Sequence, residues 1–109
     1  MSRRRGNDAK LVVIYWRDIP AQVTAGGRAD GAKVLLEARF QHAIDRAAAV
    51  AGKTATEDYV AEWRRVTEPL TGDPEEQARA RAAQLEAQYP RPDLERLVRS
   101  GGLEQEDSQ

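Results

Sequence analysis

The chain of 109 residues has the length of one domain, and a chain of this size can bury one modest core without covalent staples. It contains no cysteine, which excludes disulfides and thiolate metal sites, and it has no apolar run long enough to cross a membrane. The net charge of −1 is unevenly distributed, because residues 1–39 carry eight Lys and Arg against four Asp and Glu, whereas residues 40–109 carry nine against fourteen.

Both ends of the chain are expected to be tails. Residues 1–9 form a basic stretch and residues 101–109 an acidic one, and short runs of like charge are usually disordered. The apolar run that follows the basic start is too short for a secretory signal. We therefore expect a single domain over residues 10–100, in a cytoplasmic protein.

The first part of this domain has the composition of strands. Residues Leu11–Trp16 are β-branched and aromatic, which predicts a strand buried on both faces or nearly so. Pro20 must end that strand or lie at an edge, because it cannot donate a ladder hydrogen bond. Residues Ala21–Ala25 predict a short second strand, and the alternation from Val34 to Phe40 predicts a third that runs into a helix near Arg39.

The remaining residues have helical spacing. Apolar residues recur at three and four residues over 40–51, and Gly52 is placed to end that helix. The Thr54–Glu57 capping box predicts a second helix that continues to Val66, and Asp73-Pro74 predicts the start of a third. A short helix follows over 94–98. The predicted fold is therefore α+β, with about three antiparallel strands followed by about four helices packed on one face. The predicted core residues are Val12, Ile14, Val34, Leu36, Phe40, Ile44, Val60 and Trp63.

No set of residues in the sequence has the spacing of a catalytic or metal site. Gly52-Lys53-Thr54 resembles the end of a phosphate-binding loop, but Ala47 stands where that loop needs a glycine. His42 is the one histidine and is expected on an exposed helix face, where Asp45 alone cannot complete a metal site. We therefore expect neither a catalytic residue nor a metal or other cofactor, and a protein that is not an enzyme.

The most distinctive segment, Tyr15–Pro20, lies where the first predicted strand ends. Trp, Tyr and Arg are the residue types that dominate binding hot spots, so this segment is a hypothetical surface for another protein. The alternative is structural, with an Arg-Asp ion pair at a strand end. The hypothetical partner-binding residues are Tyr15, Trp16, Arg17, Asp18 and Pro20.

The same segment carries a family resemblance. The motif is Tyr15-Trp16-Arg17-Asp18-Ile19-Pro20-Ala21-Gln22-Val23, and it resembles the small bacterial "virulence factor" domain family. The resemblance extends over about half of the chain and includes Arg39-Phe40, the residues around Ala43–Ala48, and Asp58-Tyr59 through Trp63. That resemblance implies an accessory or scaffold role, close to folate- and cobalamin-dependent one-carbon enzymes, and it implies no catalytic residues.

A second pattern favours a different function. Residues Lys33 to Val66, read as strand, helix and helix, are similar to a ribbon-helix-helix DNA-binding dimer, a type of transcriptional regulator. Its DNA-binding residues would be Lys33, Arg39, Lys53 and Thr54. Glu37 would then face a polyanion, and the earlier strands would compete for the free edge of the strand, so we place this function second. The sequence leaves the oligomeric state open.

Overall fold

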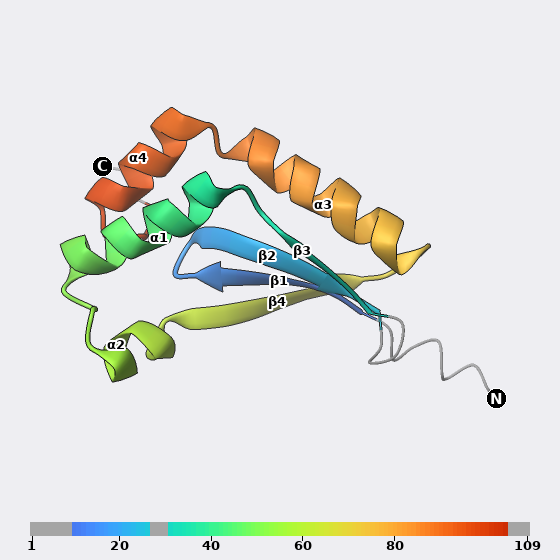
Figure 1. The fold of residues 1–109 in the computed structure, drawn as a ribbon, viewed down its shortest axis with the longest axis horizontal. Coiled ribbons are helices and arrows are strands. Elements are labelled where there is room, and N and C mark those ends of the chain that lie inside the picture. The colour runs from blue at the N-terminus through green and yellow to red at the C-terminus, as the bar shows by residue number, and fades with distance from the viewer. Residues whose placement is uncertain (1–9, 27–30, 105–109) are drawn as a thin grey trace.

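A computed structural model describes residues 10–26 and 31–104 of the chain. Within these ranges the chain forms one four-stranded antiparallel sheet and four helices (Figure 1). The elements in chain order are β1 (Lys10–Trp16), β2 (Ile19–Ala25), β3 (Ala32–Leu35), α1 (Ala38–Ala51), α2 (Thr56–Ala61), β4 (Trp63–Pro69), α3 (Pro74–Gln88) and α4 (Arg91–Arg99). The predicted α+β class is confirmed, with a fourth strand in addition to the three expected.

The strands lie in the order β3-β2-β1-β4, and each pairs antiparallel with its neighbours. The three longer helices lie on one side of the sheet (Figure 1). Helix α3 packs across β3, β2 and β1, whereas α1 packs on β2 and against α4. Short α2 lies at the end of the sheet, in the connection from α1 to β4 (Figure 1).

The predicted second helix is wrong beyond Ala61, because residues Trp63–Pro69 form strand β4. All seven of these residues pair with β1 without a register shift. A helix there would have left one edge of β1 without hydrogen-bond partners, and backbone groups in a core-forming strand need them. Val66 and Thr67, with β-branched side chains, suit the strand better than the helix.

The core lies between the sheet and the helices, and β1 faces it with the opposite residues from those predicted. Leu11 and Val13 are buried, whereas Val12 and Ile14 lie on the other face and are only half-buried. Every residue of this run is apolar, so the sequence does not fix which alternate set points inward. The register settles it, because Leu11 and Val13 oppose the buried Ala25 and Val23 of β2.

The remaining core predictions divide by element. Leu36, Phe40 and Ile44 are buried as predicted, and Val34 packs partly buried against them. The prediction that Val60 lies in the core is wrong, since this residue is 56% exposed on the short peripheral helix α2. Trp63 is partly buried at the edge of the core, from a strand and not from the expected helix.

Pro20 lies inside β2 and not at the end of β1 or on an edge strand. The structure accommodates it at a register shift, where Pro20 opposes Tyr15 while Gln22 opposes Ile14. Strand β3 pairs with β2 only from Gln22 onward. The missing N–H of proline therefore falls where the ladder is already interrupted.

Two of the three predicted helix ends are confirmed. Gly52 ends α1 in the left-handed conformation, with φ 73°. The Asp73 side chain caps α3 by accepting a hydrogen bond of 2.9 Å from the Glu76 N–H, and Pro74 follows at the first turn. The predicted capping box is wrong, because α2 begins after Ala55 and no side chain caps it.

The predicted domain boundary at residue 100 lies too early. Gly101 and Gly102 are buried, and the backbone from Gly101 to Glu104 contacts the β1–β2 turn. The domain thus extends at least to Glu104. Residues 1–9 and 105–109, predicted as tails, lie outside the described residues.

Candidate functional site

The aromatic part of the Tyr15–Pro20 segment is buried. Trp16 is 0% exposed and Pro20 is among the fully buried side chains, so the structure contradicts their placement on a binding surface. The indole Nε1 of Trp16 donates a hydrogen bond of 2.9 Å to the Tyr59 carbonyl, and the two rings stack at 5.7 Å. Gly102 closes the other side of the indole so tightly that a Cβ there would lie 3.0 Å from the Trp16 ring. Two distant segments thus cover the end of the hairpin.

Arg17 occupies the first position of the two-residue turn between β1 and β2. Its φ of 55° lies in the left-handed region, which favours glycine and costs other residues about 1–2 kcal/mol. The side chain is held on two sides, by an ion pair of 3.2 Å between Nε and Glu62 and a hydrogen bond of 3.1 Å from Nη1 to the Gly101 carbonyl. These contacts offset the cost of the turn conformation.

Asp18 joins the same turn to two other parts of the chain. One carboxylate oxygen lies 3.0 Å from Arg64 Nη2, and the other accepts a hydrogen bond of 2.7 Å from the Glu104 N–H. The Asp18 N–H in turn donates to the Gly102 carbonyl at 2.8 Å. Arg64 also lies over the ring of Tyr15, at 4.7 Å. These contacts make the segment a structural junction, and of its five predicted partner-binding residues only Tyr15, Arg17 and Asp18 are partly exposed.

The four residues of the DNA-binding alternative do not form one surface. Lys33 lies in β3, which pairs with β2 in the sheet and is not a free ribbon. Arg39 is held at the start of α1 by Glu37 at 2.7 Å and by the backbone of α3. Lys53 and Thr54 follow the opposite end of α1, and Lys53 lies 3.6 Å from Glu62. The chain also continues from short α2 into β4, so the ribbon-helix-helix arrangement is absent from the described residues.

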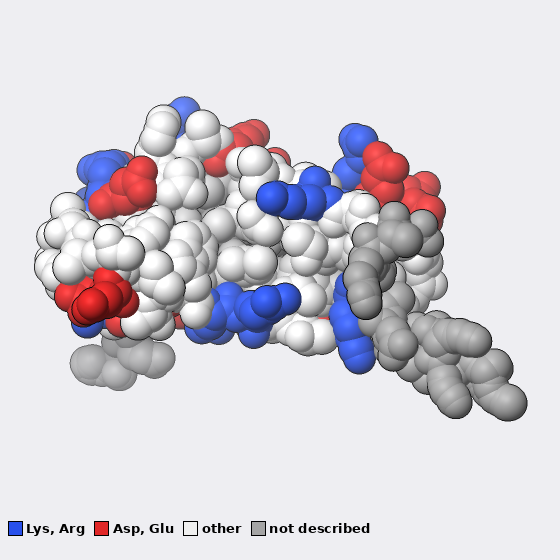
Figure 2. Space-filling view, turned by 60° about the horizontal axis from the view of Figure 1, so that its bottom comes forward, with Lys and Arg blue, Asp and Glu red and all other residues white. Residues whose placement is uncertain are grey.

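The side of the sheet opposite the helices carries a distinct set of side chains, which we call the open face. The one acid within the four strands, Glu68, points to the helices and pairs with Arg81 at 2.9 Å. Leu35 on the open face is 65% exposed. Seen from the β4 side, basic side chains border a broad uncharged surface, and acids lie around its margin (Figure 2). By strand register the open face comprises Lys10, Val12, Ile14, Gln22, Thr24, Lys33, Leu35, Arg65 and Thr67.

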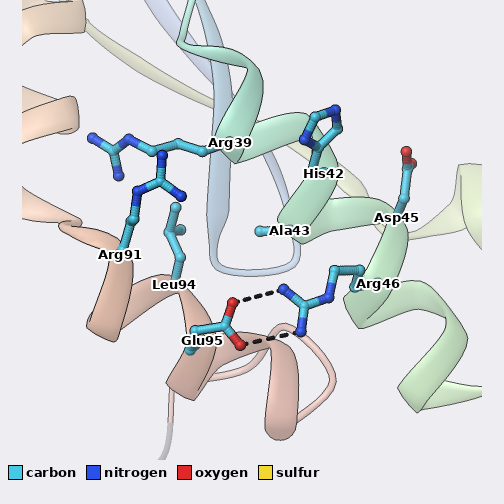
Figure 3. Close-up of a pocket in the computed structure, with 8 residues that line it drawn as sticks. All are labelled: Arg39, His42, Ala43, Asp45, Arg46, Arg91, Leu94 and Glu95. Atoms are coloured by element: carbon cyan, nitrogen blue, oxygen red, sulfur yellow. Dashed lines mark hydrogen bonds and ion pairs between the residues drawn. The ribbon is translucent and has the colours of Figure 1, made fainter.

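A groove between α1 and α4 is the second candidate (Figure 3). It is open to solvent and has a volume of about 560 Å³. Arg39, His42 and Arg91 line its walls, and the buried Ala43 and Leu94 form an apolar floor. His42 is exposed, as predicted. The sequence held no signal for Arg91, because the groove exists only when α4 packs against α1.

The acids at the groove are engaged by neighbours. Arg46 of α1 and Glu95 of α4 form a two-pronged ion pair with distances of 2.6 and 3.1 Å (Figure 3). Hydrogen bonding to Arg46 lowers the pKa of Glu95. Asp45 accepts a hydrogen bond of 3.1 Å from Gln41. Neither acid is thus placed to work with His42 in proton transfer.

Tyr89, at the end of α3, lies close to the hairpin turn. Burial raises the pKa of its phenol above the ordinary value, and the nearby Tyr15, Glu104 and Asp18 raise it further. Its ring meets Phe40 edge to face at 6.3 Å. The phenol is therefore neutral at pH 7 and serves the packing of α3 against α1.

Comparison with known proteins adds one finding. A protein-family model described as "Virulence factor" matches residues 14–98, from the middle of β1 to the end of α4. No curated protein and no solved structure matches the chain. Over residues 10–26 and 31–104, no three His, Asp or Glu side chains are grouped to hold a metal ion. No helix in these ranges is long and apolar enough to span a membrane.

Proposed function

The chain belongs to the virulence factor family, and from this premise we propose that it is a non-enzymatic accessory domain that binds another protein through the open face of its sheet. A single observation carries the proposal. Helices cover one side of the sheet, and the other side exposes apolar residues among basic ones.

The apolar part of the open face supports binding to a protein. Val12 and Ile14 are half-buried and Leu35 is mostly exposed, so a partner that covers them removes apolar surface from water. Burial of such surface contributes about 25 cal/mol per Å² before the costs of association. An antiparallel sheet with one solvated face more often carries polar residues there, so these three side chains are the unusual feature.

The charges of the open face indicate the chemistry of the partner. Lys10, Lys33 and Arg65 lie on it, and no acid of the strands does. An acidic rim around an apolar centre on the partner would complement them. The family resemblance further proposes one-carbon enzymes that use folate or cobalamin as partners to be tested first.

The absence of enzymatic activity is part of the same proposal. His42 is the one histidine of the chain, and it lies in an open groove. Its neighbouring acids are held by Arg46 and Gln41. Catalysis would need a nearby group free to orient the imidazole or to share its proton.

Capture from native cell extract with three forms of the protein tests the proposal. The open-face variant is Lys33→Glu with Arg65→Glu, and the control is Arg79→Glu with Arg99→Glu, which makes the same charge change on exposed residues of α3 and α4. We expect one or more acidic proteins to be retained by wild type and control, to be lost from the open-face variant, and to elute as salt is raised. Capture of the same proteins by all three forms would contradict the proposal, provided that circular dichroism shows each form folded.

A further inference from the structure

The groove between α1 and α4 is separate from the open face and has the size and the chemistry of a small-molecule site. Its volume of about 560 Å³ falls within the range of ligand pockets, about 300–1,000 Å³. The floor is apolar, because Ala43 and Leu94 are each only 3% exposed. Three donor side chains, Arg39, His42 and Arg91, also line the groove (Figure 3).

The guanidinium of Arg39 is held in place and still has N–H groups available to a ligand. Its Nε donates to Glu37, Nη2 donates to the Glu86 carbonyl at 2.9 Å, and Nη1 donates to the Tyr89 carbonyl. A guanidinium has five N–H groups, so these three bonds leave one N–H without an acceptor on each of the two terminal nitrogens. The ring of Phe40 lies 4.5 Å from the guanidinium carbon and further fixes its plane. Such a preorganised fork matches the two oxygens of a carboxylate or phosphate.

Arg91 adds a cation that the described part of the chain does not neutralise. No residue within 10–26 and 31–104 accepts a hydrogen bond from Arg91 or forms an ion pair with it. It lines the same groove as Arg39 and His42. The imidazole of His42 supplies at least one N–H whether neutral or charged.

The carboxylates that line the groove leave it cationic, because Asp45 and Glu95 face the three arginines Arg39, Arg46 and Arg91. Glu95 is held at both oxygens by Arg46 (Figure 3), and Asp45 accepts a hydrogen bond from Gln41. Like charges that converge on a partly enclosed surface raise the local concentration of counter-ions. We propose that the groove binds a small organic anion, with a carboxylate or phosphate between Arg39 and Arg91 and a short apolar body against Ala43 and Leu94.

Nuclear magnetic resonance titration of the full chain tests this inference. The probes are benzoate and phenyl phosphate, which combine an oxyanion with an apolar ring and separate the two anion chemistries. Inorganic phosphate lacks the ring, and benzyl alcohol lacks the charge. We expect saturable shifts of the backbone amides around His42 and Leu94 with benzoate, phenyl phosphate or both, and weaker binding of the two incomplete compounds.

The test variant is Arg91→Gln, which removes the charge, keeps a polar side chain and does not disturb the contacts of Arg39 with α3. Charge-assisted hydrogen bonds are worth enough that this change should weaken probe binding about tenfold or more. The control is Arg79→Gln, an exposed arginine of α3 away from the groove, which should bind as wild type does.

Three results would each overturn the inference. The first is that neither aromatic anion shifts the amides of the groove. The second is that benzyl alcohol binds as tightly as the anions. The third is that Arg91→Gln binds the anionic probes as tightly as Arg79→Gln does. The titration needs no protein partner, so its outcome is independent of the open-face proposal.

Discussion

Replacing Gly102 with alanine tests the junction at the end of the hairpin. Gly102 has a φ of +93°, where an L residue is strained, and a Cβ would lie 3.0 Å from Cζ3 of Trp16. Trp16 is fully buried and donates to the Tyr59 carbonyl, so its ring cannot move aside without losing that bond. The substitution therefore combines a backbone cost with a steric one.

Gly52→Ala separates the two costs. Gly52 also has a positive φ, +73°, but nothing lies within 4 Å of its added Cβ. We expect the backbone cost alone there, about 1–2 kcal/mol. In Gly102→Ala the overpacking against Trp16 adds about 1–3 kcal/mol, for a total loss of about 2–5 kcal/mol.

Urea denaturation followed by circular dichroism measures both losses in the free energy of unfolding. Thermal melts should agree, at roughly 4–8 °C per kcal/mol for a domain of this size. The reasoning is refuted if Gly102→Ala is no less stable than Gly52→Ala. That result would mean that residues 101–104 do not pack on the hairpin in solution.

Three further predictions concern single groups. Asp73→Ala removes the cap that accepts from Glu76 N–H and should cost about 1 kcal/mol in a urea titration, whereas Asp73→Asn, which retains an acceptor, should cost much less. The phenol of Tyr89 should titrate above the ordinary tyrosine range by ultraviolet difference spectroscopy, since burial raises its pKa; its folded-state pKa exceeds its unfolded one, so its contribution to stability is complete below about pH 10 and is lost as the pH rises further. Arg46 lowers the pKa of Glu95 in the folded protein, so the ion pair stabilises the fold above the pKa that Glu95 has in the unfolded chain, and this stabilisation is lost as the pH falls through the folded-state pKa. A series of thermal melts should therefore show a slightly lower melting temperature for Glu95→Gln than for wild type at pH 7, and no difference in strong acid.

The sequence predicted the elements whose signals are local. Asp73-Pro74 marks the start of α3 because a cap and a pre-set proline act within one turn. Gly52 marks the end of α1 for the same reason. The α+β class followed from the change from strand-like to helical spacing near Arg39.

Features that depend on tertiary contacts could not be read from the sequence. Residues 63–69 form a strand because the edge of β1 needs a partner about 50 residues away, and no local pattern reveals that need. The inward face of β1 depends on which side α3 covers. The groove at Arg39 and Arg91 likewise depends on the packing of α4 against α1.

The Tyr15–Pro20 segment illustrates the same limit for a site. Its residue types suit a hot spot, but they also suit a buried junction, and only the docking of residues 59 and 102 on Trp16 distinguishes the two. The open face was missed because Val12 and Ile14 were assigned to the core.

The contacts of the hairpin turn with Gly101–Glu104 affect how the protein can be made. Arg17 and Asp18 meet partners 84 and 86 residues further along the chain. During translation these contacts of the turn can form only when almost the whole domain has left the ribosome. Until then the nascent hairpin lacks the residues that cover Trp16. Contacts so distant in sequence also slow folding. A fusion partner or tag at the C-terminal end should accordingly be joined after Glu104, since a junction before Glu104 would remove residues that close the fold.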